Sequence, residues 1–239
     1  MMAKIEFDEA VSWVSRAVAE HPGKLAQALA EHFHVGRTAA STVIARLVEE
    51  AYLSRSGAAN SPVFASGKRR LLVDSYSLPG VDAKAMWDRE FAPFLSLPEE
   101  VAATARDGFI SVVHNASRHA KASGLYVVVE QTPRYLEMTI SDNGIGVFKK
   151  IAQKIKTKEL ALAVEAVAEG RAASAVKRRA TSDIYSLASM FDEFLVEANG
   201  VQFPAPKRKK KLSLEDDGTA EPGTSVFMKL ALKKKKPAL

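Results

Sequence analysis

Two short runs of alternating apolar side chains do most to restrict the fold of this chain. In Leu125 to Gln131 and in Tyr135 to Ser141 every second residue is apolar, and only Thr132-Pro133-Arg134 separates the runs. Alternation with period two predicts half-buried strands, and the short proline-containing break predicts an antiparallel pair. A long helical pattern from Pro98 to Ser123 precedes them. The chain should therefore contain an antiparallel sheet with a helix packed on it.

The rest of the sequence divides around this centre. Residues 150 to 190 are helical in pattern, and Phe194 to Glu197 and Ser225 to Leu232 predict two further strands. An N-terminal segment rich in Ala, Val and Leu at helical spacing is interrupted by a Gly/Ser/Asn/Pro cluster at 54–62. We expect an N-terminal domain at 1–74, a connector at 75–97, a second domain at 98–232 and a basic tail at 233–239.

Composition excludes several classes of protein. The chain has no cysteine, which removes disulfides and thiolate zinc sites and is typical of a reducing cytoplasm. No apolar stretch is long enough for a membrane helix, and acidic residues stand where a signal peptide needs an apolar run. We expect a cytoplasmic protein. The net charge of +6 is a mild pointer to polyanions, and much of it lies in basic runs at 207–211 and 233–236. These runs are either inert or a source of salt-sensitive DNA affinity.

The N-terminal pattern predicts two short helices joined by a turn. Leu25, Ala28 and Leu29 share one helix face, His34-Val35-Gly36 breaks the pattern, and a second helix begins at Arg37-Thr38. Gly36 should supply the turn's freedom, and the Thr38 hydroxyl should cap the second helix. Residues 10 to 72 resemble a winged helix-turn-helix, with Val63 to Ala65 leading through Gly67 into a basic wing and then a second short strand.

Such a module binds double-stranded DNA by placing the start of its second helix in the major groove. The expected wing bases suit phosphate or minor-groove contact, and helix-turn-helix regulators are commonly homodimers that read two half-sites. The alternative is a winged helix used only for protein contacts. The expected DNA-binding residues are Arg37, Thr38, Ser41, Thr42 and Arg46 of the helix, with Lys68, Arg69 and Arg70 of the wing.

The second domain resembles the GHKL superfamily of ATPases, which includes gyrase and histidine kinases. The resemblance depends on FISVVHNASRHAKAS, on SDNGIG after two strands, and on Gly223-Thr224 before a final strand. It implies an α+β fold, with helices on one face of a mixed, largely antiparallel sheet, and ATP or ADP with magnesium as ligand. The implied nucleotide-binding residues are Asn115, which would also hold the magnesium, His119, Asp142, Gly144, Gly146 and Thr224.

Two departures from the family pattern argue against hydrolysis. Ser111 stands where the family places a carboxylate that acts on the attacking water, and a serine hydroxyl cannot be that base. Thr181-Ser182-Asp183 replaces the glycines whose amides cradle phosphates. The basic residues at 177–179 can offset the charge of Asp183, so nucleotide binding stays open. Catalytic residues are expected to be absent, as is a histidine-kinase phosphoacceptor motif.

Three functions remain open at this point. The first is a transcription regulator that binds DNA and uses the GHKL-like domain for nucleotide sensing, dimerisation or partner contact. The second is an active ATPase or an anti-sigma-type serine kinase. The third is a pseudo-ATPase that binds a protein partner, such as a toxin or a sigma factor, in the manner of an antitoxin.

Overall fold

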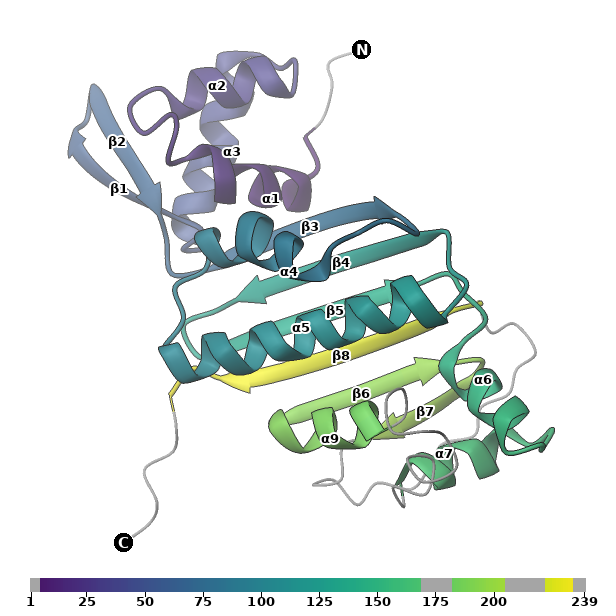
Figure 1. The fold of residues 1–239 in the computed structure, drawn as a ribbon. Coiled ribbons are helices and arrows are strands. Elements are labelled where there is room, and N and C mark those ends of the chain that lie inside the picture. Colours follow the sequence, from purple (N-terminus) through teal and green to yellow (C-terminus); the bar gives the residue numbers. More distant parts are fainter. Residues whose placement is uncertain (1–4, 169–181, 205–221, 234–239) are drawn as a thin grey trace, which may run out of the picture.

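The computed structural model describes residues 5–168, 182–204 and 222–233. Their hydrophobic residues form two separate cores, one built from residues before 72 and one from residues 72 onward. The smaller core belongs to three helices and a hairpin (Figure 1). These elements are α1 (Phe7–Ala17), α2 (Leu25–His32), α3 (Arg37–Glu49), β1 (Leu53–Ala58) and β2 (Ser61–Ser66).

The two helices expected around residue 35 are present, although the turn differs in detail. Leu25 and Leu29 of α2 and Leu47 of α3 are fully buried, as their spacing predicts. His34, not Gly36, takes the left-handed conformation in the turn, with φ of 53°. Gly36 precedes α3 with an ordinary φ of −72° and no side-chain cap, so the expected cap by Thr38 was wrong.

The segment expected to be an interruption forms a hairpin instead. β1 and β2 pair in antiparallel register from Leu53↔Ser66 to Ala58↔Ser61, which places the turn at Ala59-Asn60. Val63 to Ala65 therefore belong to the second strand of the hairpin, not to its first. Sequence alternation did not reveal β1, because five of its six residues are exposed.

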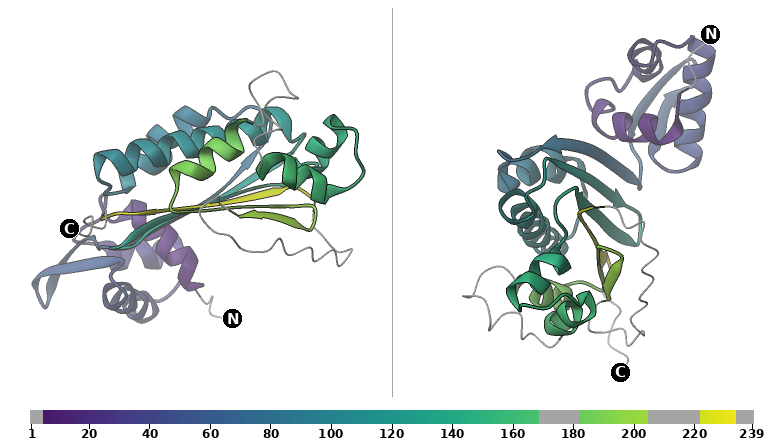
Figure 2. Two further views of the ribbon diagram at one scale, coloured as in Figure 1. Left: turned by 90° about the horizontal axis from the view of Figure 1, so that it is seen from below. Right: turned by 90° about the vertical axis from the view of Figure 1, so that its right-hand side faces the viewer.

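The larger unit is a six-stranded sheet in the order β3-β4-β5-β8-β6-β7. Every pairing between described strands is antiparallel, so the expected mixture of orientations is not found among them. Helices cover one face of the sheet, as the left view of Figure 2 shows for α5 and α9. The strands are β3 (Arg70–Ser77), β4 (Gly124–Gln131), β5 (Tyr135–Asp142), β6 (Glu193–Ala198), β7 (Val201–Pro204) and β8 (Thr224–Ala231).

The helices of the larger unit lie where the sequence pattern predicts them, and the structure gives their first and last residues. The long α5 runs over Glu99–His119, and Phe109 and Val113 on its inner face are fully buried against the sheet. The expected helical stretch at 150–190 contains α6 (Val147–Lys154), α7 (Leu160–Ala168) and α9 (Ser182–Met190). Within the described ranges, no helix has the length and apolarity needed to cross a membrane.

The boundary between the units lies earlier than residue 74. β3 starts at Arg70 and pairs with β4 along its whole length, so it belongs to the large sheet. The expected connector at 75–97 is part of the larger unit too. It contains α4 (Ala83–Met86), η1 (Trp87–Phe91) and η2 (Ala92–Phe94), and the buried Trp87 and Phe91 pack in the larger core.

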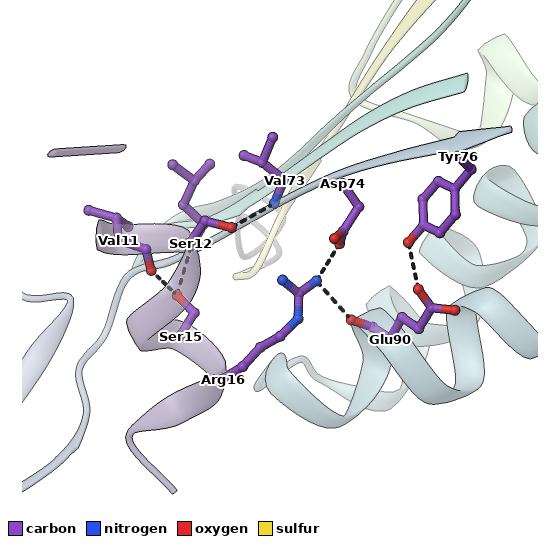
Figure 3. Close-up of polar contacts among 9 residues, drawn as sticks. Val11, Ser12, Ser15, Arg16, Val73, Asp74, Tyr76 and Glu90 are labelled. Atoms are coloured by element: carbon purple, nitrogen blue, oxygen red, sulfur yellow. Dashed lines mark hydrogen bonds and ion pairs between the residues drawn. The ribbon is translucent and has the colours of Figure 1, made fainter. Parts of the chain in front are cut away.

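Helix α1 joins the two units by lying along β3, the outer strand of the sheet (Figure 3). Side chains of α1 satisfy backbone N–H groups that an edge strand otherwise leaves unpaired. Arg16 adds an ion pair to Asp74 and a hydrogen bond of 3.5 Å to the carbonyl oxygen of Glu90. The hydroxyl of Ser12 accepts a hydrogen bond from Val73 N at 3.2 Å, and that of Ser15 accepts one from Leu71 N at 3.4 Å.

Candidate functional site

A cavity lies between α5, α6, α9 and strands β5, β6 and β8 of the sheet. Five of the six residues that the sequence predicted for a nucleotide site line it, and the sixth, Gly144, is two residues from the lining residue Asp142. Residues far apart in the chain meet here because β5 and β8 pair in register, with Asp142 opposite Thr224. The predicted residues in the lining are Asn115, His119, Asp142, Gly146 and Thr224.

The turn after β5 requires glycine at two positions. A Cβ on Gly144 would lie 2.2 Å from the carbonyl oxygen of Ala120, so only glycine lets the turn approach the end of α5. Gly146 has φ of +82°, and a Cβ there would lie 2.1 Å from Oδ1 of Asn199. The Asn199 side chain holds this turn, because its Nδ2 donates to the carbonyl oxygen of Ile145 at 3.1 Å and its Oδ1 accepts from Lys149 N at 3.2 Å.

Asp142 supplies the carboxylate of the cavity. Its Oδ1 accepts a hydrogen bond of 2.8 Å from the N–H of Gly144. Burial raises the pKa of Asp142, and the hydrogen bonds from Gly144 and Thr224 oppose that rise. Thr224 in turn accepts a hydrogen bond from Val147 N at 3.0 Å. A fixed, half-buried carboxylate of this kind suits a ligand that presents an N–H donor.

The α6 part of the lining is cationic, which the sequence analysis did not anticipate. Lys150 and Lys154 of α6 both line the cavity, and Lys150 Nζ donates to the carbonyl oxygen of His119 at 2.7 Å. Burial and the neighbouring Lys154 and Lys121 lower the pKa of Lys150. Burial, Lys150, His114 and Lys154 lower the pKa of His119. The Lys149-Lys150 pair shortly after Gly146 was the signal available in the sequence.

The cavity is narrow in this structure. Its volume of about 70 Å³ is smaller than the roughly 150 Å³ that holds a benzene ring in an engineered cavity. The lining side chains must therefore move apart before a purine enters. Ser111 lies on α5 one turn before Asn115, as expected. Lys177 to Arg179 and Thr181 lie outside the described residues, and of Ser182 and Asp183 only the backbone, which begins α9, is described.

The second candidate surface is the exposed side of α3. Four of the residues predicted to contact DNA lie at the start of this helix and are exposed. Arg46 is exposed too, but its guanidinium is held 3.6 Å over the ring of Phe7 and by a 2.8 Å ion pair with Glu50. The Thr42 hydroxyl donates to the carbonyl oxygen of Thr38 at 3.0 Å. The exposed side chains left to face a ligand are therefore Arg37, Thr38 and Ser41.

The basic triplet at 68–70 is not on the hairpin. Lys68 and Arg69 lie between β2 and β3, and Arg70 is the first residue of β3, where the two units join. Arg69 binds Glu130 of the sheet at 2.9 Å and stacks over Tyr52, and its Nε is buried without a hydrogen-bond partner. Arg70 is half-buried and donates to the carbonyl oxygens of Gly67 and Arg69. Of the triplet, only Lys68 is exposed. The expected basic wing was therefore misplaced, because the hairpin turns earlier in the chain.

Arg55 on β1 was missed by the sequence analysis. It is exposed on the hairpin and lines a groove with Ser41 and Ala45 of α3. The polar SRSGAANSP stretch was its only signal, because this strand has no apolar alternation. Residues 5–66 nevertheless carry seven acidic side chains against five basic ones. Any polyanion contact by this unit is therefore confined to a few cations.

No protein-family model matches this chain, and no curated protein matches it significantly in sequence.

Proposed function

We propose that this chain is a DNA-binding regulator whose larger unit binds an adenine nucleotide and does not hydrolyse it. The observation that carries the proposal is the cavity, where five residues of a nucleotide-binding pattern meet although they come from three separate parts of the chain. Convergent polar groups in a cavity, with titratable residues whose pKa values are shifted, are what a ligand site requires.

The cavity offers chemistry for both ends of a nucleotide. Asp142 can accept the hydrogen bond of an adenine amino group, and the glycine turn at 144–146 lets backbone approach the ring. Lys150 and Lys154 place positive charge at the other part of the lining. The order of a long helix, two antiparallel strands, the glycine turn and a final Gly-Thr strand supports a GHKL-like fold.

Hydrolysis is left out of the proposal for a chemical reason. An attacking water needs a base within hydrogen-bond reach, and Ser111 offers a hydroxyl where that base would stand. The active ATPase or serine-kinase alternative requires another described or undescribed residue to take that role. Phosphate release that disappears in Asn115→Ala would favour this alternative.

The regulatory part of the proposal depends on the N-terminal unit. Three helices followed by a hairpin, with Arg37, Thr38 and Ser41 exposed at the start of α3, suit a winged helix that enters a major groove. We include a homodimer in this proposal, because such units read paired half-sites. A monomeric mass at micromolar concentration, with and without a palindromic duplex, would refute the proposed homodimer.

Nucleotide binding is tested directly by isothermal titration of the full chain with ADP. Asp142→Asn should weaken binding about tenfold, because a charge-assisted hydrogen bond is lost. The matched control is Glu137→Gln, a carboxylate of the same strand that pairs with Lys229 instead of lining the cavity. No detectable binding by the unmodified chain would defeat the nucleotide part. Binding that Asp142→Asn leaves unchanged would show that the ligand lies elsewhere.

A further inference from the structure

The cavity combines opposite charges in a fixed arrangement. Asp142 stands at the strand ends, and no cation is among the groups that shift its pKa. Lys154 and Lys121 lie close enough to Lys150 to lower its pKa together with burial, and Lys150 and Lys154 do the same to the pKa of His119. From Asn143 to Lys158 the chain contains five lysines and no acidic residue. The segment that contains α6 is therefore strongly positive, and two of its lysines, Lys150 and Lys154, line the same cavity as Asp142.

A divalent cation does not fit this donor set. Magnesium is bound through one or two carboxylates together with substrate phosphates. Asn115 offers a neutral amide, and Ser111 one turn earlier offers a hydroxyl. Asp142, the one carboxylate in the described lining, already accepts a hydrogen bond from Gly144 N, and Lys150 and Lys154 share the lining. Among the residues that the structure describes, no group of three or more His, Asp or Glu side chains can hold a metal ion. The ammonium groups would repel the ion that Asn115 was expected to hold.

We propose that the cavity binds its nucleotide without a metal ion, with Lys150 and Lys154 neutralising the phosphates in place of magnesium. This inference depends on the proposed nucleotide-binding function. It makes a diphosphate or triphosphate the preferred ligand class over the bare nucleoside, since the ammonium groups have no role with adenosine.

The position of Lys150 supports this role. Its Nζ is already fixed by donation to the carbonyl oxygen of His119, the last residue of α5. An ammonium has three N–H donors, so donors remain for a phosphate without a new ordering of the side chain. Lys154 lies one turn further along α6 and is more exposed, which places the second charge nearer the solvent.

The test compares ADP and adenosine binding to the full chain by isothermal titration, with excess magnesium and with EDTA. EDTA should change the ADP dissociation constant less than about twofold. Lys150→Met should weaken ADP about tenfold, because charged hydrogen bonds are lost, and should leave adenosine unchanged. Lys150→Arg should retain most ADP affinity. Lys149→Met is the matched control, since Lys149 carries the same charge on the same helix, is exposed and does not line the cavity.

The possible outcomes distinguish a failure of the metal-free site from a failure of the proposed nucleotide binding. ADP binding that is lost in EDTA, or that Lys150→Met leaves unchanged, overturns the metal-free site while nucleotide binding stands. An equal loss in Lys149→Met assigns the effect to general charge and overturns it also. Inorganic tripolyphosphate that binds as tightly as ADP overturns it as a nucleotide site and identifies a general polyanion surface. If neither adenosine nor ADP binds, the nucleotide function fails together with it.

Discussion

The salt dependence of DNA binding gives the sharpest test of the N-terminal unit. Three cations are exposed where a duplex on α3 and the hairpin can reach them, namely Arg37, Arg55 and Lys68. Each phosphate contact contributes about −0.9 to the slope of log affinity against log salt, so the expected slope is about −2.7. Between about 50 mM and about 200 mM salt, affinity should therefore fall about 40-fold. Arg37→Ala should reduce the slope to about −1.8 and the fall to about 12-fold.

Fluorescence anisotropy with a mixed-sequence duplex three helical turns long measures this slope. The background for every variant should have glutamine in place of the basic residues at 207–211 and 233–236, which would otherwise add their own phosphate contacts. Arg46→Ala is the matched control, because its guanidinium is engaged by Phe7 and Glu50. A slope that Arg37→Ala leaves unchanged would refute this contact surface. An equal reduction in Arg46→Ala would refute the distinction between free and engaged arginines.

Three further outcomes are expected. A steady-state assay with magnesium and ATP should show no phosphate release above background, and Asn115→Ala should not change this; release that the variant abolishes would disprove it. Ser12→Ala with Arg16→Ala should lower the free energy of unfolding by about 1–3 kcal/mol in urea denaturation, because the edge of β3 loses hydrogen bonds, whereas the hairpin control Ser54→Ala should change it little. Burial raises the pKa of Asp142, so its ionised form costs stability once the pH exceeds that raised pKa. Asp142→Asn should therefore raise the free energy of unfolding at pH 7. This gain should shrink as the pH falls through the raised pKa, and a gain independent of pH would contradict the assignment to burial.

Local patterns were enough to predict the centre of the fold. α5, β4 and β5 occur within a few residues of their expected limits, because burial on one face imposes a readable period on each of them. β1 was not predicted, and β3 was expected only as a short strand of the wing, not as a strand of the large sheet. β1 is exposed over almost its whole length, and β3 pairs with a strand that starts about fifty residues later. Neither an exposed strand nor a strand whose partner is distant in the chain has to show an alternation of apolar residues in its own sequence.

The candidate site shows the same division. Asp142, Gly144 and Gly146 were predicted because a single turn contains them. Asn199 and Lys150 were not, because their roles come from tertiary packing against that turn and against the end of α5. Arg46 and Arg69 were predicted as DNA contacts from their charge and from their places in the expected second helix and wing. Glu50 follows Arg46 by four residues, a helical spacing that the sequence did offer. Glu130 becomes a neighbour of Arg69 only after folding, and sequence spacing could not show it.

The junction limits how the two units can influence each other. Two serine hydroxyls and Arg16 bind α1 to β3. β3 pairs along its length with β4, and β4 pairs with β5, the strand that ends at Asp142. A nucleotide can change DNA affinity only through a conformation that it favours, and any such coupling acts equally in both directions. The cavity must widen to admit a purine, so movement of α6 and the end of α5 is the change available to it. Because α5 lies on the opposite face of the sheet from the N-terminal unit (Figure 2), that movement must pass through the strands to reach α3.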